Sequence, residues 1–162
     1  MNAAHSNAAV RVSHESWPAL LGLATQEVFA IMVGTELTTA PEPFVESGVD
    51  MTSMVGLAGE LCGVLTVRST GAAVALIASK MLGVDPDTDA QQTWDAFGEV
   101  CNMIAGNFKH KIAGMGNDCM LSVPTVITGA DYSVHSLAES GKISVNLLFE
   151  GHPLIVALEV HS

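Results

Sequence analysis

A run of apolar residues at helical spacing, between residues 94 and 112, most constrains the fold of this chain. At about 100° of rotation per residue, one side of a helix would carry Trp94, Phe97, Cys101, Ile104, Phe108 and Ile112. Thr88 and Gln91 have the spacing of a capping box, and Lys109 to Lys111 place positive charge where it complements the helix dipole. The pattern predicts a long helix from Thr88 to about Ala113 that covers a hydrophobic core.

Two shorter segments also have helical features. Residues 17–33 have amphipathic periodicity, with Ser16 as a candidate N-cap and Pro18 in the first turn. Residues 71–82 are apolar and rich in Ala, and Gly83, a residue type that often ends helices, follows them. We therefore expect a helix in each segment, the second of them buried.

Strand-forming sequence fills most of the remaining chain. Residues 51–57 and 60–69 are predicted to form a hairpin that turns at Ala58-Gly59, because the second run alternates and is rich in β-branched residues. Further strands are predicted between Gly-, Asp- and Pro-containing loops at 118–123, 125–127, 132–137, 143–149 and 154–160. Helices that are separated from runs of strands indicate an α+β fold, with the long helices packed on an antiparallel β-sheet.

The two long predicted helices share a sequence pattern. Residues 27–34 align with residues 99–106 at an offset of 72 residues, and strand-forming sequence follows each helix. A diverged duplication of a helix-plus-strands unit explains this pattern, and chance similarity between two amphipathic helices is the alternative. The first copy has Ala30 where the second has Asn102. If the amide performs chemistry, the first helix has lost it.

Length and hydropathy indicate a single domain. The chain has 162 residues, 49% of them hydrophobic, which suffices for one core and is short for two. Residues 1–14 lack the apolar core of a signal peptide, so we expect a disordered tail followed by one domain at 15–162. No segment approaches 18 uninterrupted apolar residues. We therefore expect a cytoplasmic protein without a membrane partner.

Charge and reactive residue types exclude several functions. The net charge of −11, with only six Lys and Arg residues, is unsuited to nucleic acid, which requires clustered cations. It suits a protein partner with a basic or mixed surface, or serves solubility alone. The His and Cys residues have no metal-binding spacing, and we expect reduced thiols and no bound metal: His5, His14, His110, His135, His152, His161, Cys62, Cys101 and Cys119. Glycine-rich nucleotide-binding motifs and nucleophile-elbow motifs are also absent from the sequence.

The opposite side of the longest predicted helix carries a polar cluster. Asp95, Glu99, Asn102 and Gly106 project within roughly 60° of one another. Taken singly, such acids are typical of a solvated surface. Gly106 lowers helix propensity by about 1 kcal/mol relative to Ala and leaves no side chain to hold a partner away. The combination predicts a docking surface.

Pro124 completes a longer pattern. Asp95, Glu99 and Asn102 are followed after 21 residues by Pro124, which gives D-x3-E-x2-N-x21-P. With each residue type used at about 5%, this pattern arises by chance in roughly one chain in a thousand of this length. It resembles the signature of the CheC/CheX/FliY phosphatases of bacterial chemotaxis, and the chain is most similar to the CheX branch. The resemblance covers nearly everything after about residue 14.

The resemblance implies a function and assigns roles. These proteins hydrolyse the aspartyl phosphate of CheY-type response regulators, and the regulator supplies Mg²⁺ and a lysine. Asn102 would orient the attacking water, and Glu99 would pair with the regulator's lysine. Asp95 and Pro124 would support the site, Asp95 at its edge and Pro124 by fixing the backbone beside the helix. The chain itself would bind no cofactor.

Two functions therefore follow for this surface. The first is a phosphatase that inserts Asn102 and Glu99 into the active site of a phosphorylated receiver domain. The second is a non-catalytic adaptor that binds a response regulator through the same face. The resemblance also implies a homodimer formed through sheet edges, where unpaired strands invite pairing.

Overall fold

The computed structural model describes residues 14–86, 89–112, 118–130 and 141–161. Its helices are a 3₁₀ turn η1 (His14–Ser16), α1 (Trp17–Val28), a π-helical turn η2 (Phe29–Val33) that continues α1, α2 (Gly71–Leu82) and α3 (Ala90–Lys111). Its strands are β1 (Thr38–Thr39), β2 (Val49–Gly59), β3 (Cys62–Thr70), β4 (Cys119–Leu121), β5 (Thr125–Thr128), β6 (Lys142–Phe149) and β7 (His152–His161). None of the described helices is long and apolar enough to cross a membrane.

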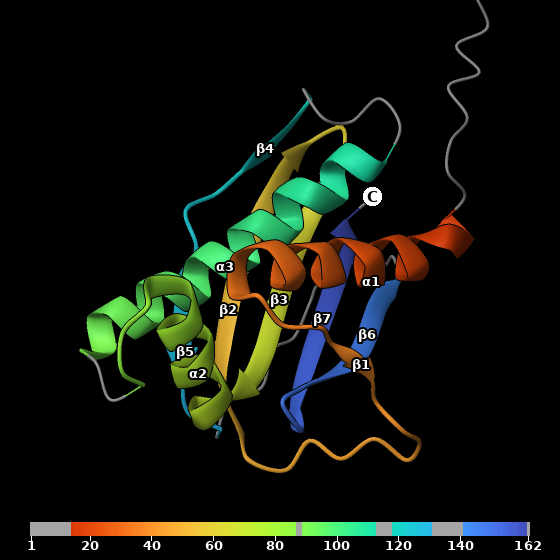
Figure 1. Ribbon diagram of the computed structural model, residues 1–162. Helices are drawn as coiled ribbons and strands as arrows, with labels where there is room; N and C mark the ends of the chain where they lie inside the picture. Colours follow the sequence, from red (N-terminus) through yellow and green to blue (C-terminus); the bar gives the residue numbers. More distant parts are fainter. Residues whose placement is uncertain (1–13, 87–88, 113–117, 131–140, 162) are drawn as a thin grey trace, which may run out of the picture.

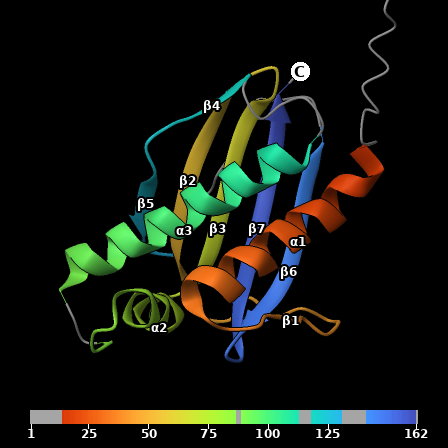
Figure 2. The same cartoon turned by 45° about the horizontal axis from the view of Figure 1, so that its top comes forward.

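The strands form one antiparallel sheet with helices α1 and α3 across one face (Figures 1 and 2). The strand order is β1-β6-β7-β3-β2-β4, and β5 also pairs with β2. This arrangement confirms the predicted α+β class. The short helix α2 lies beside the first turns of α3, at one end of the layer (Figure 2).

The order of the strands has the symmetry that a duplication produces. β3 of the first half pairs with β7 of the second at the centre of the sheet. β2 and β6 flank this pair, and β5 and β1 lie outside them. Each half therefore contributes a long helix and an equivalent set of strands. The helix α2 connects the halves and has no counterpart among the described elements.

The core lies between the sheet and the apolar faces of the two long helices. Phe97, Ile104 and Phe108 of α3 have no exposed surface, as the periodicity predicts. The ring of Trp17 meets that of Phe108 edge-on at 5.9 Å, and so joins the start of α1 to the end of α3. At about 25 cal/mol per Å² of buried apolar area, such residues provide most of the driving force for folding.

One prediction about the core is wrong. Trp94 remains 39% exposed. Helix α3 begins at Ala90 and its first turns project beyond β5, beside α2 (Figures 1 and 2). Trp94 has the correct helical phase, but the sheet does not extend under this part of the helix to bury it.

The ends of the helices follow local sequence, with two differences. Helix α2 has the predicted bounds, because the Thr70 side chain accepts a hydrogen bond from the Ala73 amide and Gly83 adopts a left-handed conformation with φ of 65°. Asp89 caps α3 by accepting from the Gln91 amide, whereas Thr88 lies outside the described residues. Ser16 occupies the N-cap of α1, but its side chain accepts no capping hydrogen bond.

The strand predictions also need correction in places. The hairpin turns at Glu60 and Leu61, not at Ala58-Gly59, because β2 continues to pair with β4 as far as Gly59. The two-residue strand β1 was not predicted, since it is short and pairs with the distant β6. The strand predicted at 132–137 lies outside the described residues.

Gly63 allows β3 and β7 to approach, and its substitution tests the central pairing. A methyl group there would lie 2.2 Å from the backbone oxygen of Glu159. We expect Gly63→Ala to lower the free energy of unfolding by about 2 kcal/mol, as overpacking does. Gly22→Ala in α1 is the control, because its methyl would lie 3.6 Å from Val145 and helix propensity improves by about 1 kcal/mol. Urea unfolding measures both, and equal stability of the two variants would contradict the account.

Candidate functional site

The four polar-face positions of α3 point away from the sheet. Asp95 and Glu99 are exposed, and Asn102 and Gly106 are half-buried. The predicted geometry of this face is therefore present. Because the opposite side of α3 is anchored in the core, the direction of these side chains is fixed by the burial of the helix. We call the surface formed by Asp95, Glu99, Asn102 and Gly106 the outward face.

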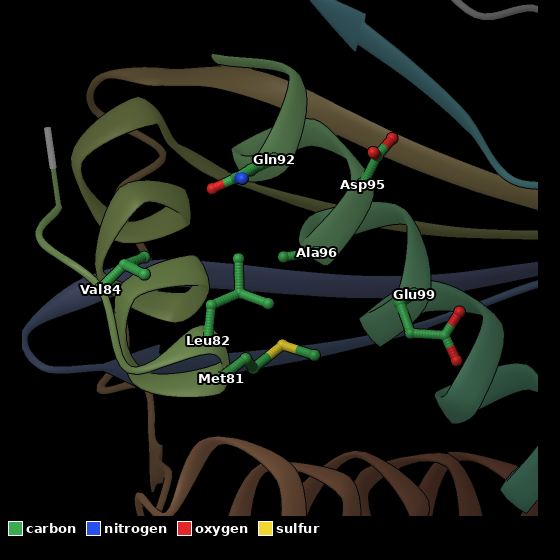
Figure 3. A pocket seen from close by; sticks show the side chains of 7 residues that line it. All are labelled: Met81, Leu82, Val84, Gln92, Asp95, Ala96 and Glu99. Atoms are coloured by element: carbon green, nitrogen blue, oxygen red, sulfur yellow. The ribbon is translucent and has the colours of Figure 1, made fainter. Parts of the chain in front are cut away.

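Two hollows border the outward face. The first lies between α2 and α3, has a volume of about 570 Å³, and is shown in Figure 3; it is lined by Met81, Leu82, Val84, Gln92, Asp95, Ala96 and Glu99. The second lies between η2 and α3 and has a volume of about 360 Å³. Asn102 and Gly106 line the second hollow together with Ile31 and Met32 of η2. Asp95 and Glu99 therefore border one hollow, and Asn102 borders the other.

Glu99 and Asn102 have no internal partner within the described part of the chain. Asp95 differs, because its Oδ1 accepts a hydrogen bond of 2.8 Å from Nε2 of Gln91, one turn earlier on α3. This bond holds Asp95 at the rim, whereas the Glu99 carboxylate and the Asn102 amide keep their hydrogen-bonding capacity for another molecule.

Gly106 leaves open space beside Asn102. A methyl group built on Gly106 would find its nearest neighbour, a Leu121 methyl carbon, at 3.9 Å, which is ordinary contact. Among the described residues, no contact therefore requires glycine here. Glycine in a helix interior costs about 1 kcal/mol relative to Ala, so packing within the described part of the chain does not explain it.

Pro124 lies behind the helix and not on the outward face. It precedes β5, and a methyl group on Gly98 of α3 would lie 3.1 Å from its Cβ and 3.7 Å from Val126 Cγ2. Gly98 is buried and directly precedes Glu99 in the chain. The contact lets α3 lie close to β5. Sequence reasoning missed Gly98, although a glycine in the middle of an amphipathic helix was the available indication.

The corresponding acid on helix α1 already has partners within this chain. Glu27 aligns with Glu99 in the repeat, but its Oε2 lies 2.8 Å from Nζ of Lys111 and accepts a hydrogen bond of 3.0 Å from Asn107. These bonds, that to Lys111 above all, lower the pKa of Glu27. Ala30, the counterpart of Asn102, is exposed and has no polar group. In the first copy of the repeat, Glu27 therefore links α1 to α3.

The reactive groups elsewhere do not form a second site in the described residues. No three His, Cys, Asp or Glu side chains among them are placed to hold a metal ion. Cys101 is buried under α3, and burial raises the pKa of its thiol to about 12. A thiol in that state is a core side chain and not a nucleophile.

Comparison with known proteins shows which family this chain resembles. The family model described as chemotaxis phosphatase CheX matches residues 51–148, which include α3 and the segment to β6. The CheY-P phosphatase CheX of Thermotoga maritima is 25% identical over 137 residues, with 82% of this chain and 87% of that protein covered.

Solved structures share the fold. The chemotaxis protein CheX from Desulfovibrio desulfuricans superimposes with a TM-score of 0.75 at 25% identity, over 90% of this chain and 99% of that one. The CheX-CheY-BeF3-Mg²⁺ complex from Borrelia burgdorferi gives a TM-score of 0.73 at 22% identity, over 90% and 98%. On the strength of the family match across more than half its length, this chain belongs to the chemotaxis phosphatase CheX family.

Proposed function

We propose that this protein accelerates hydrolysis of the aspartyl phosphate on a CheY-type response regulator by inserting Glu99 and Asn102 into the receiver's active site. The observation that carries the proposal is the unpaired state of these two side chains on the rigid outward face. Among the described residues, this carboxylate and this amide have no partner; they lie three residues apart on an anchored helix and are available to a partner's pocket. The Borrelia relative, solved with CheY, BeF3 and Mg²⁺, supports a receiver as that partner.

In this proposal, Asn102 orients the attacking water, which the receiver does not orient by itself. In the proposed reaction, water attacks phosphorus in line with the aspartyl oxygen, the P–O bond to the aspartate breaks, and phosphate leaves. The receiver's own Mg²⁺ and lysine would stabilise the charge on the phosphoryl oxygens. The amide of Asn102 both donates and accepts hydrogen bonds, so it can hold one water in the line of attack without itself changing protonation.

Glu99 sets the register of the complex in this proposal. Its carboxylate pairs with the receiver's lysine, and charge-assisted hydrogen bonds of this kind are about twice as strong as neutral ones. All residues that line its hollow are acidic, amide or apolar, so no cation of that hollow competes for the carboxylate.

The remaining predicted site residues act indirectly. Asp95, held by Gln91, adds negative charge at the rim. Gly106 leaves room for the receiver beside Asn102. Pro124 fixes the distance between β5 and α3 through its contact with Gly98, and so positions Glu99.

We further propose that the protein is a homodimer joined at a sheet edge. The edge strand β4 pairs with β2 on one side only. Met120 on this strand is 75% exposed, and Val123 just after it is 85% exposed. Exposed apolar residues along an unpaired strand favour pairing with another strand.

Replacement of Asn102 tests the chemistry. We expect Asn102→Ala to reduce phosphate release from a radiolabelled, phosphorylated regulator by at least about a hundredfold, because the water loses its orientation. The circular dichroism spectrum should not change, since Asn102 faces away from the core. Asn146→Ala on β6 makes the same change on the opposite half of the sheet and should retain the rate. Equal rates for Asn102→Ala and wild type would refute the assignment; tight binding without any acceleration by wild type would favour an adaptor.

Gly106→Ala separates stability from docking. The added methyl improves helix propensity and meets nothing closer than 3.9 Å, so the free energy of unfolding should rise by about 0.5–1 kcal/mol. The same methyl would stand between Asn102 and the receiver, so kcat/KM should fall at least about tenfold. Gly22→Ala on α1 provides a variant with the same substitution and unchanged activity. A fully active Gly106→Ala variant would show that no partner approaches here.

Light scattering tests the dimer. We expect wild type to have twice the mass of the 16.8 kDa chain, and Val123→Lys to have the mass of one chain, because a lysine at a sheet edge opposes pairing. Val45→Lys is the matched control, since Val45 is 65% exposed in the loop before β2. A monomeric wild type, or a Val123→Lys variant that remains dimeric, would contradict this edge.

A further inference from the structure

The hollow between α2 and α3 has an apolar side formed by the end of α2. Figure 3 shows Met81 and Leu82 extending from α2 towards α3, with the carboxylates of Asp95 and Glu99 on the far side. Leu82 is 48% exposed and Val84 is 37% exposed. These side chains lie at the border of the outward face, where solvent reaches them.

The end of α2 is built to keep these residues in place. The amides of Gly83 and Val84 both donate to the carbonyl oxygen of Ser79, at 2.9 and 3.3 Å, and the Ser79 hydroxyl donates to the Val84 carbonyl oxygen. Gly83 adopts the left-handed conformation that turns the chain at this point. Two of these hydrogen bonds hold Val84 and the third holds Gly83, so bonds within this chain fix the turn that carries the apolar wall of the hollow.

The two sides of the hollow differ in chemistry. Asp95 and Glu99 place two carboxylates on the α3 side, and the lining residues include no cation. A complementary surface would present an apolar side chain next to a positive charge. A second copy of this chain that placed its own hollow here fits poorly, because the Asp95 and Glu99 carboxylates of the two rims would repel.

We infer that this hollow selects the response regulator, by receiving an apolar side chain that lies beside the regulator's active-site lysine. The inference rests on the proposed function, because Glu99 both lines the hollow and is assigned to that lysine. A regulator that brings its lysine to Glu99 must cover the adjoining wall of Met81, Leu82 and Val84. Leu82 and Val84 are then specificity-determining residues that act on binding, whereas Asn102 acts on the chemical step.

Paired leucine substitutions test this division. Leu82→Ser removes apolar contact from the hollow, and we expect the concentration of phosphorylated regulator that gives half the maximal rate to rise roughly 5- to 20-fold, with the maximal rate unchanged. Leu23→Ser is the matched control, because Leu23 is 47% exposed on α1. It should shift neither parameter more than about twofold. Leu82→Met keeps the apolar contact, so the regulator concentration that gives half the maximal rate should stay at its wild-type value.

The outcomes separate this inference from the proposed function. If Asn102→Ala is inactive while Leu82→Ser has wild-type kinetics, the hollow plays no part in recognition and the inference fails alone. If Leu82→Ser instead changes the molecular mass in solution, the hollow is an interface between copies of this chain, and the inference is overturned. If Asn102→Ala remains fully active, the proposed function fails, whatever the behaviour of Leu82→Ser.

Discussion

The burial of one side of α3 against the sheet is the constraint on which the site depends. Phe97, Ile104 and Phe108 are completely enclosed. Rotating the helix to redirect its polar side chains would expose these three apolar side chains, at a cost of about 1.5–3 kcal/mol for each. The directions of Glu99 and Asn102 are thus set by hydrophobic packing on the opposite side of the same helix. A site that has to enter another protein's pocket benefits from this rigidity, because little conformational entropy is lost on docking.

The two halves of the molecule use one framework differently. Glu27 and Glu99 occupy equivalent positions on the long helices, yet only Glu27 is satisfied internally, by Lys111 and Asn107. These bonds add a polar contact between α1 and α3. The other half of the duplicated framework keeps a carboxylate and an amide that have no partner in the part of the chain that the structure describes. Divergence after duplication thus accounts for the difference between the copies. The acid of the first copy supports helix α3, and α3 carries the outward-facing acid and amide of the second copy.

Much of the fold could be predicted because its determinants are local. Residues 71–82 form a helix with the predicted bounds, since Thr70 and Gly83 provide both caps within the segment itself. The outward face was also predictable, because helical periodicity alone places its residues together. Trp94 was misplaced because its burial depends on where the sheet ends. The Gly98–Pro124 contact and the hollow beside α2 join residues far apart in sequence, so a local pattern could draw attention to Gly98 but could not identify what it contacts.

A structure of this protein bound to a receiver domain loaded with Mg²⁺ and BeF3 would test the central claim most directly. We expect the Asn102 amide to lie within hydrogen-bonding distance of the attacking-water position beside the beryllium, with the Glu99 carboxylate on the receiver's lysine. A receiver seated on another surface, such as the one around Ala30, or a complex in which Asn102 faces solvent, would contradict it.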